Sequence, residues 1–467
     1  MRLCHAGWRR RAERGGGMRR PRRSDPALRA AFSGGLVVYL LGVFVGALDV
    51  NVLGPALPLI ARGFHTTFAW TAWTVTAYSV AYAASTVLSG AIGDRVGRAS
   101  AFRVGVGLFG VASVVAALSP SFLVFVLARV VQGAGAGAVY PNAQAEGVQA
   151  FPLERRGLAL GLFGAVFGLA SIIGPNVGGG LAQLFGFPAI FWFNAVAAFV
   201  VLLLSARLRA GQATPRPMPD VGGGLAFASL LAAGLLSLAA VGAARVGCLA
   251  AAAAAAAIFA WRQRRARPPF LDPAPFVRSS GGLLMFGAAL IGLNMSAAVF
   301  VPDLAQRELG LGVFASGLAL MPAALSGAVL AGVGGVLVDR IGARAVLLAG
   351  LAAGVVGGLL LAVGRVDDLR FVLAMVAFGL ATAFTMGAPT NRMAMALYPD
   401  AQAGEALALV AVFRSVGLAA GPILLTQAQA ARGFGGMFGT VALACAVALV
   451  VFLLMRRSPG SAATAAA

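Results

Sequence analysis

The chain of 467 residues contains no lysine, two histidines and three cysteines. Without lysine it has neither a Walker A loop for a nucleotide phosphate nor an amine for a Schiff base, so ATP-driven transport by this chain is excluded. His5 and His65 do not form a pair, and Cys4, Cys248 and Cys445 lack both C-x-x-C and metal-ligand spacing. We therefore expect no metal, no cofactor, no disulfide and no enzyme activity.

Charge is also scarce, and this scarcity indicates a membrane protein. Only 11% of the residues are charged, 60% are hydrophobic, and the mean hydropathy is +0.90. A soluble protein of this length could not cover its surface with so few charges. Apolar runs of about 20 residues, long enough to cross a ~30 Å hydrocarbon core, recur from residue 35 to residue 455.

The net charge of +21 comes from arginine alone, and its placement argues against nucleic-acid binding. Ten of the 36 arginines fall in the first 30 residues, ahead of the first apolar run. A basic segment at that place ordinarily faces anionic lipid on the cytoplasmic side, whereas a nucleic-acid site needs interleaved aromatics on a folded platform. Residues 1–34 are therefore predicted to be a cytoplasmic tail, with translation starting at Met1 or Met18.

The apolar runs predict fourteen membrane spans, in two halves of six with two extra spans between them. The predicted units are an N-terminal half (35–206), linkers (207–280) around extra spans at 222–243 and 246–261, a C-terminal half (281–455), and a second tail (456–467). The span at 246–261 is short and rich in alanine. Arginine placement supports the count, because predicted cytoplasmic segments hold 28 arginines and external loops hold 6.

A charged motif, G-x-x-x-D-R-x-G, occurs twice, at Gly90–Gly97 and at Gly335–Gly342. Each copy lies where one apolar run ends and the next begins, which predicts two related halves with the same turn at one membrane surface. A solvated turn would explain one copy alone, whereas two copies favour a gate that exploits the positive end of a helix dipole. The candidate gating residues are Gly90, Asp94, Arg95, Gly97, Arg98, Asp339, Arg340 and Gly342.

Two charged residues lie inside predicted spans at similar depth. Asp49 follows the start of its span by about 21 Å, and Arg129 lies about 18 Å from the same surface. Because a carboxylate inside a membrane is costly, such groups are functional unless they are paired. A proton cycle needs an acid whose proton affinity changes with water access or a neighbouring cation. Asp49 and Arg129 are therefore the candidate proton-coupling residues, and a static ion pair is the alternative.

These motifs, in this order, resemble the major facilitator superfamily, and within it the fourteen-span drug:proton antiporters. The resemblance rests on Gly90–Arg98, on Arg129-Val-Val-Gln132-Gly133-Ala-Gly135, on Leu48-Asp49 with a downstream Pro58, on Gly174-Pro175 with Gly178-Gly179, and on Pro269-Phe-Leu-Asp272. It implies an all-α major-facilitator fold with two six-helix halves and two extra central helices. It also implies that the first motif is a conformational latch, the second couples protons, and the glycine-proline segment is the antiporter motif.

The substrate-binding candidates are adaptable or hydrogen-bonding groups inside the spans. Arg414 lies near the middle of its span, where it would either counter an electron-rich group of a substrate or bind backbone carbonyls. Broad apolar pockets suit lipophilic substrates, although each candidate is also explained by ordinary packing. The candidates are Asn51, Trp73, Tyr78, Asn294, Met295, Phe384, Met386 and Arg414.

The combined prediction is a proton-coupled efflux antiporter in the bacterial inner membrane, with both termini cytoplasmic. Its partners would be the lipid bilayer, protons and a small amphipathic organic substrate, and the proton gradient would take the place of a cofactor. Nucleic acid is not expected, and a periplasmic adaptor is left open. The alternatives are a narrow exporter of one metabolite and a membrane sensor or scaffold that keeps the fold without transport.

Overall fold

The computed structural model describes residues 35–149, 151, 156–208, 220–267, 269–270, 279–386, 388–396 and 403–455. These residues form helices and contain no strand. The described residues do not include the predicted tails or most of both linkers. They also do not include Asp272, one of the residues on which the family resemblance rests.

The N-terminal half is built from six long helices. They are α2 (Gly35–Val52), α5 (Trp73–Val96), α6 (Arg98–Ala117), α7 (Phe122–Gln149), α8 (Arg156–Phe185) and α9 (Pro188–Ser205). Three short elements follow α2, namely η1 (Gly54–Ala56), α3 (Leu57–Gly63) and α4 (Phe68–Thr71). A proline in the first two positions of η1 and of α3 explains the breaks, because proline cannot donate the hydrogen bond that would continue the preceding helix.

The C-terminal half repeats this plan. Its elements are α13 (Ser279–Ser296), η3 (Ala297–Val299), α14 (Val301–Glu308), α15 (Val313–Leu318), α16 (Met321–Ile341), α17 (Ala343–Ala362), α18 (Asp368–Thr385), α19 (Ala388–Ala396) and α20 (Ala403–Leu454). The backbone leaves helical geometry inside α20 at Arg432 and at Gly433, where φ is 64°. Before this break α20 packs on α13, and after it Cys445 packs on Gly354 of α17.

The helices α10 (Val221–Ala239) and α11 (Gly242–Arg265) lie between the halves in sequence. The second helix extends over 24 residues and contains the sixteen residues that were predicted as a span. Asp220 caps α10 by accepting a hydrogen bond from Gly223 N at 2.9 Å, and it pairs with Arg262 of α11 at 2.6 Å. Leu88 of α5 contacts Gly224, so α10 covers part of the N-terminal half.

Twelve helical stretches of the described residues are long and apolar enough to cross a membrane. The chain is therefore an all-helical, multi-pass membrane protein, although twelve is lower than the predicted fourteen. The count differs from the prediction at two places. The helix α8 is not among the twelve, and the stretch Leu409–Leu454 counts once although it contains the break at Arg432 and Gly433.

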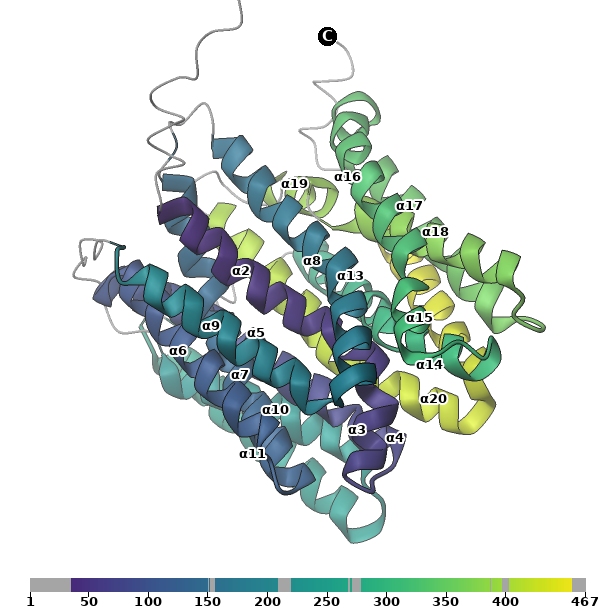
Figure 1. The fold of residues 1–467 in the computed structure, drawn as a ribbon. Coiled ribbons are helices and arrows are strands. Elements are labelled where there is room, and N and C mark those ends of the chain that lie inside the picture. Colours follow the sequence, from purple (N-terminus) through teal and green to yellow (C-terminus); the bar gives the residue numbers. More distant parts are fainter. Residues whose placement is uncertain are drawn as a thin grey trace, which may run out of the picture.

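The two halves contact each other along α5 and α20, and they also meet at one end of the bundle. Figure 1 shows α6, α7 and α9 on one side of the molecule and α16, α17 and α18 on the other. A Cβ added to Gly54 of η1 would lie 2.9 Å from the carbonyl oxygen of Val299 in η3, and Gln306 of α14 donates a hydrogen bond to Pro55 O at 3.3 Å. We call this the far end, and the opposite end, which carries the turns at Gly97 and Gly342, the turn end.

Candidate functional site

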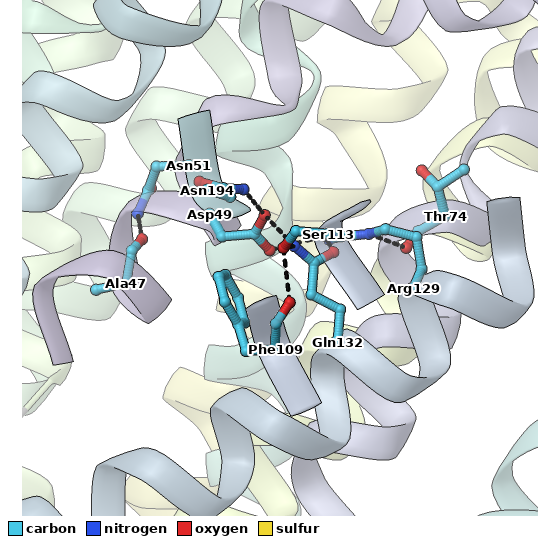
Figure 2. A network of polar contacts seen from close by, with 9 residues as sticks. All are labelled: Ala47, Asp49, Asn51, Thr74, Phe109, Ser113, Arg129, Gln132 and Asn194. Carbon is cyan, nitrogen blue, oxygen red and sulfur yellow. Dashed lines mark hydrogen bonds and ion pairs between the residues drawn. The ribbon is translucent and has the colours of Figure 1, made fainter. Parts of the chain in front are cut away.

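A buried ion pair joins α2 to α7. Arg129 donates from an Nη atom to Asp49 Oδ2 at 2.7 Å, and its Nε donates to the carbonyl oxygen of Thr74 in α5 at 3.3 Å (Figure 2). Asp49 is 0% exposed and Arg129 is 1% exposed. Two opposite charges are thus held together in the interior, and the two candidates for proton coupling are in direct contact.

Three further polar side chains, one each from α6, α7 and α9, complete this network. Gln132 accepts from Arg129 at 2.6 Å and donates to Asp49 Oδ1 at 3.2 Å and to Ser113 Oγ at 2.9 Å. Asn194 of α9 donates to Asp49 Oδ1 at 2.6 Å. The Asp49 carboxylate therefore accepts three hydrogen bonds, which is how a buried carboxylate is stabilised in its ionised form.

Sequence reasoning did not single out Ser113, Gln132 or Asn194. Gln132 stood inside a quoted motif but was given no role. Asn194 is a lone amide in the apolar helix α9, and a polar side chain inside a span is itself a signal of function. Because Asn194 and Asp49 lie 145 residues apart, only the folded helices show that they meet.

Aromatic rings cover the guanidinium of Arg129. Its Cζ atom lies 4.3 Å from the ring centroid of Tyr78 and 5.9 Å from that of Phe191. Tyr78 in turn stacks on Tyr82, with ring centroids 6.2 Å apart and an interplanar angle of 16°. A cation against ring faces stays stabilised when its carboxylate partner becomes neutral, because the rings attract it independently.

The first G-x-x-x-D-R-x-G copy ends α5 and begins α6. Asp94 accepts from Arg98 Nε at 2.9 Å and forms an ion pair with it at 2.8 Å. Gly97 has φ 93°, which only glycine adopts without strain, so the tight turn between the helices depends on this residue. Arg95 is exposed, and the position of Gly90 has no heavy atom within 4 Å of an added Cβ.

The second copy has the same backbone. Gly342, with φ 88°, separates α16 from α17 as Gly97 separates α5 from α6. Arg340 is exposed in the last turn of α16, and Asp339 lies beside it in the same helix. The two motifs therefore form equivalent turns, as duplication of a half would produce.

The glycines of the predicted antiporter motif bring helices together in α8. A Cβ added to Gly178 would lie 2.0 Å from the carbonyl oxygen of Val52 in α2, and one added to Gly179 would lie 2.9 Å from that of Val313 in α15. A Cβ added to Gly174 would lie 2.8 Å from Asn51 Cβ in α2. Pro175 lies inside the helix. This segment packs against both halves, so it belongs to their interface.

The predicted substrate residues divide into packed and partly exposed groups. Trp73 is buried with Ala419 and Ile423, and Phe384 is buried between Val338 and Val346, so both fill hydrophobic clusters in this conformation.

The remaining candidates are polar or adaptable. Asn51 donates to Ala47 O at 2.7 Å, whereas the buried Asn294 has a side-chain oxygen that accepts no hydrogen bond from the described residues. Met295, Met386 and Arg414 are partly exposed. Among the described residues, no group of three or more histidine, cysteine, aspartate and glutamate side chains could hold a metal ion.

Comparisons with known proteins agree with this arrangement. The sequence model of a family described as the Major Facilitator Superfamily matches residues 39–422 and also residues 284–467. "Multidrug resistance protein Stp" of Mycobacterium tuberculosis is 29% identical over 414 residues, which cover 85% of this chain and 75% of that protein. "Riboflavin transporter RibZ" of Clostridioides difficile is 26% identical over 398 residues, covering 83% and 86%. The solved D-xylose-proton symporter superposes with a TM-score of 0.69 at 14% identity, covering 91% of this chain and 98% of that one.

Proposed function

The chain belongs to the Major Facilitator Superfamily of membrane transporters, and from that premise we propose that it is a proton-coupled antiporter. It exports amphipathic organic compounds by alternating access. The observation that carries this proposal is the buried contact between Asp49 and Arg129, with its 2.7 Å separation. Asp49 is the proton-carrying residue, and Arg129 is the cation that its charge balances.

The chemistry follows from the network. When Asp49 is ionised, its carboxylate holds Arg129, Gln132 and Asn194. Protonation removes the charge and turns one oxygen into a donor, so the ion pair is abolished and at least one of these hydrogen bonds is lost, whereas Thr74 O and the ring of Tyr78 still hold Arg129. One proton thus changes the contacts among α2, α7 and α9. A scaffold without transport would not need such a site.

The observed contacts support a conformation closed at the far end. Phe68 of α4 packs on Phe300 with ring centroids 6.0 Å apart, and Phe314 N donates to Gln183 Oε1 of α8 at 2.9 Å. Both contacts join the two halves. In the proposed cycle the turn end faces the cytoplasm, and the two D-R turns latch that end when the far end opens.

We also propose that the chain crosses the membrane fourteen times. The helix Arg156–Phe185 has 30 residues, enough to cross a ~30 Å core. The break at Arg432 and Gly433 divides α20 into two segments. Both pack on α13, and the second also packs on α17, where Cys445 meets Gly354. An even number places both termini on one side, and the arginine distribution makes that side the cytoplasm of a bacterial inner membrane.

The relatives favour export but leave its breadth open. The name of the Mycobacterium tuberculosis relative concerns multidrug resistance, which fits a broad exporter. The name of the Clostridioides difficile relative concerns riboflavin alone, which fits a narrow transporter of one metabolite. We favour broad export and keep the narrow transporter as the second candidate.

Everted membrane vesicles that contain the full chain test the proposal. The vesicles are energised until their lumen is acidic, a panel of amphipathic compounds is added, and release of lumenal protons is recorded with a pH-sensitive dye. Release evoked by several unrelated compounds is expected, and release by one compound identifies the narrow transporter. Vesicles without the protein are the control. If compounds accumulate without any proton release, coupling to protons is refuted.

A further inference from the structure

The membrane-spanning part of α20 carries a positive charge that the proton site does not use. Arg414 lies 11 residues after the start of α20 at Ala403, which corresponds to a depth of about 16 Å. Its side chain is partly exposed, and among the described residues it forms neither an ion pair nor a hydrogen bond. Because a charge at this depth is costly, an arginine without a fixed partner indicates a ligand.

Two tyrosines of the opposite half face this charge. The helix α5 packs along α20, where the Thr76 hydroxyl donates to Ala419 O at 3.0 Å. Tyr82 of α5 and Tyr140 of α7 lie within electrostatic range of Arg414, and both are partly exposed. Gln144 donates to the Tyr140 hydroxyl at 3.1 Å and holds it in place. Counted from the turn ends of α5 and α7, the tyrosines lie at about 21 Å and about 14 Å, the depth range of Arg414. Transporters bind substrates near this midplane, where the halves meet.

The described spans offer no carboxylate that would attract a cationic compound to this place. Asp49 is fully buried and already holds Arg129. The other acidic residues of the described helices lie near the ends of their spans, and they are Asp94, Glu146, Asp303, Glu308, Asp339, Asp368 and Glu405. A cation would therefore meet the charge of Arg414 without compensation, whereas an anion would supply the missing partner.

We infer that Arg414, together with Tyr82 and Tyr140, binds an anionic oxygen of the exported compound. A guanidinium binds a carboxylate or phenolate through paired N–H donors, and phenol hydroxyls donate to the same kind of oxygen. The ring face of Tyr82 suits an aromatic body next to that oxygen. This inference rests on the proposed export function and names its substrate class: aromatic, amphipathic compounds with a carboxylate or phenolate.

The same tyrosine links this site to the proton site. Tyr82 stacks on Tyr78 at 6.2 Å, and the guanidinium of Arg129 lies 4.3 Å from the Tyr78 ring centroid. One pair of stacked rings therefore separates the cation that would bind the substrate from the cation paired with Asp49. A substrate that moves Tyr82 changes the surroundings of Arg129 through two successive contacts, both of them with Tyr78.

Two dyes that share a xanthene ring system but differ in charge test whether the site prefers an anionic compound. Fluorescein is anionic and rhodamine 6G is cationic at neutral pH, and their uptake into everted vesicles is followed together with proton release. We expect fluorescein to be the better substrate, and Arg414→Gln to raise its KM at least tenfold. Arg414→Lys should restore part of this loss because it keeps the charge. The exposed Arg245 of α11, changed to glutamine, is the matched control and should leave both dyes unchanged.

Tyr82→Phe keeps the ring stack but removes the hydroxyl, so it tests the site without removing a charge. It should raise the KM for fluorescein several-fold with little change for rhodamine 6G. Fluorescein should also raise the Tm of the wild type more than that of Arg414→Gln, a difference that a purely structural role would not produce.

Where at least one dye is taken up, three results overturn the inference. They are equal losses for both dyes in Arg414→Gln, a KM for fluorescein within twofold of the wild type, and transport of rhodamine 6G alone. Transport of rhodamine 6G alone would be compatible with proton-coupled export, but it would refute the anionic substrate class. If neither dye is taken up, the inference also fails, and the compound panel decides separately whether the protein is an exporter.

Discussion

Replacing Asp49 with asparagine tests the proposed proton cycle separately from substrate binding. The carboxylate accepts from Gln132 and Asn194 through Oδ1 and from Arg129 through Oδ2. An asparagine offers one oxygen and one NH2 group of nearly the same shape. Whichever way the amide is turned, its NH2 group faces a donor, so at least one of these hydrogen bonds is lost. The variant also mimics protonated Asp49, because both are neutral.

The cost of Asp49→Asn can be bounded from the network. One buried donor left without an acceptor costs about 1–3 kcal/mol, and a buried ion pair that loses one charge costs about 3–5 kcal/mol. We expect a loss of folding stability nearer the lower of these two ranges, because the aromatic rings and the Thr74 carbonyl still stabilise the charge of Arg129. For transport, one proton exchanged across one pH unit supplies about 1.4 kcal/mol, enough for a tenfold substrate gradient. The variant should lose that entire gradient.

Proteoliposomes allow both consequences to be measured on one preparation. Gradient-driven accumulation of a compound from the panel should fall to the level of empty liposomes in Asp49→Asn. Exchange of labelled for unlabelled compound without a pH gradient should persist, because it needs no change of protonation. The Tm in detergent reports the loss of stability and shows that the variant is folded.

A second buried acid provides the matched control. Asp303 is 0% exposed and pairs with Arg307 at 2.8 Å, but it lies in α14 at the far end. Asp303→Asn should lower the Tm and keep gradient-driven accumulation. If Asp49→Asn still supports the tenfold gradient, Asp49 does not carry the proton. If Asp303→Asn abolishes accumulation instead, the proton-coupling role has been assigned to the wrong residue.

Two glycine positions give further predictions, measured by Tm and transport rate. Each variant is compared with the same substitution at a control glycine, where an added Cβ would have no heavy atom within 4 Å. Gly97→Ala should lower stability by about 1–3 kcal/mol because its φ of 93° strains any side chain, whereas Gly107→Ala inside α6 should be neutral or slightly stabilising. Gly178→Ala should push α8 away from Val52 and stop transport, whereas Gly168→Ala should not. Equal effects within either pair would contradict these assignments.

The helices themselves could be predicted from apolar runs and from the two repeated turns, because membrane thickness sets the length of a span and glycine marks a tight turn. Breaks inside the spans were not predicted. Gly54-Pro55 divides the first span into α2, η1 and α3, and Pro302 begins α14 in the equivalent place. The periodicity of an apolar run does not show where its backbone hydrogen bonds stop.

The charged residues of the site could be predicted because a charge inside a span is rare. Asp49 and Arg129 stood out for that reason, and the structure brings them into contact. The neutral partner Asn194 could not be predicted to join them, since its place depends on the rotation of α9 about its axis. The same ambiguity affected Trp73 and Phe384, which were proposed for the cavity and pack inside hydrophobic clusters.

The position of α8 explains how a change at one carboxylate can reach the interface between the halves. A Cβ added to Gly174 would lie 2.8 Å from Asn51 Cβ and 3.3 Å from Leu48 O, and these residues flank Asp49 on α2. On the other half, a Cβ added to Gly317 of α15 would lie 2.4 Å from the carbonyl oxygen of Pro175 in α8. Backbones this close leave no side chain to absorb a shift. If protonation of Asp49 displaces α2, as the proposed cycle requires, α8 must take up the displacement, and α8 cannot move without changing its contact with the second half.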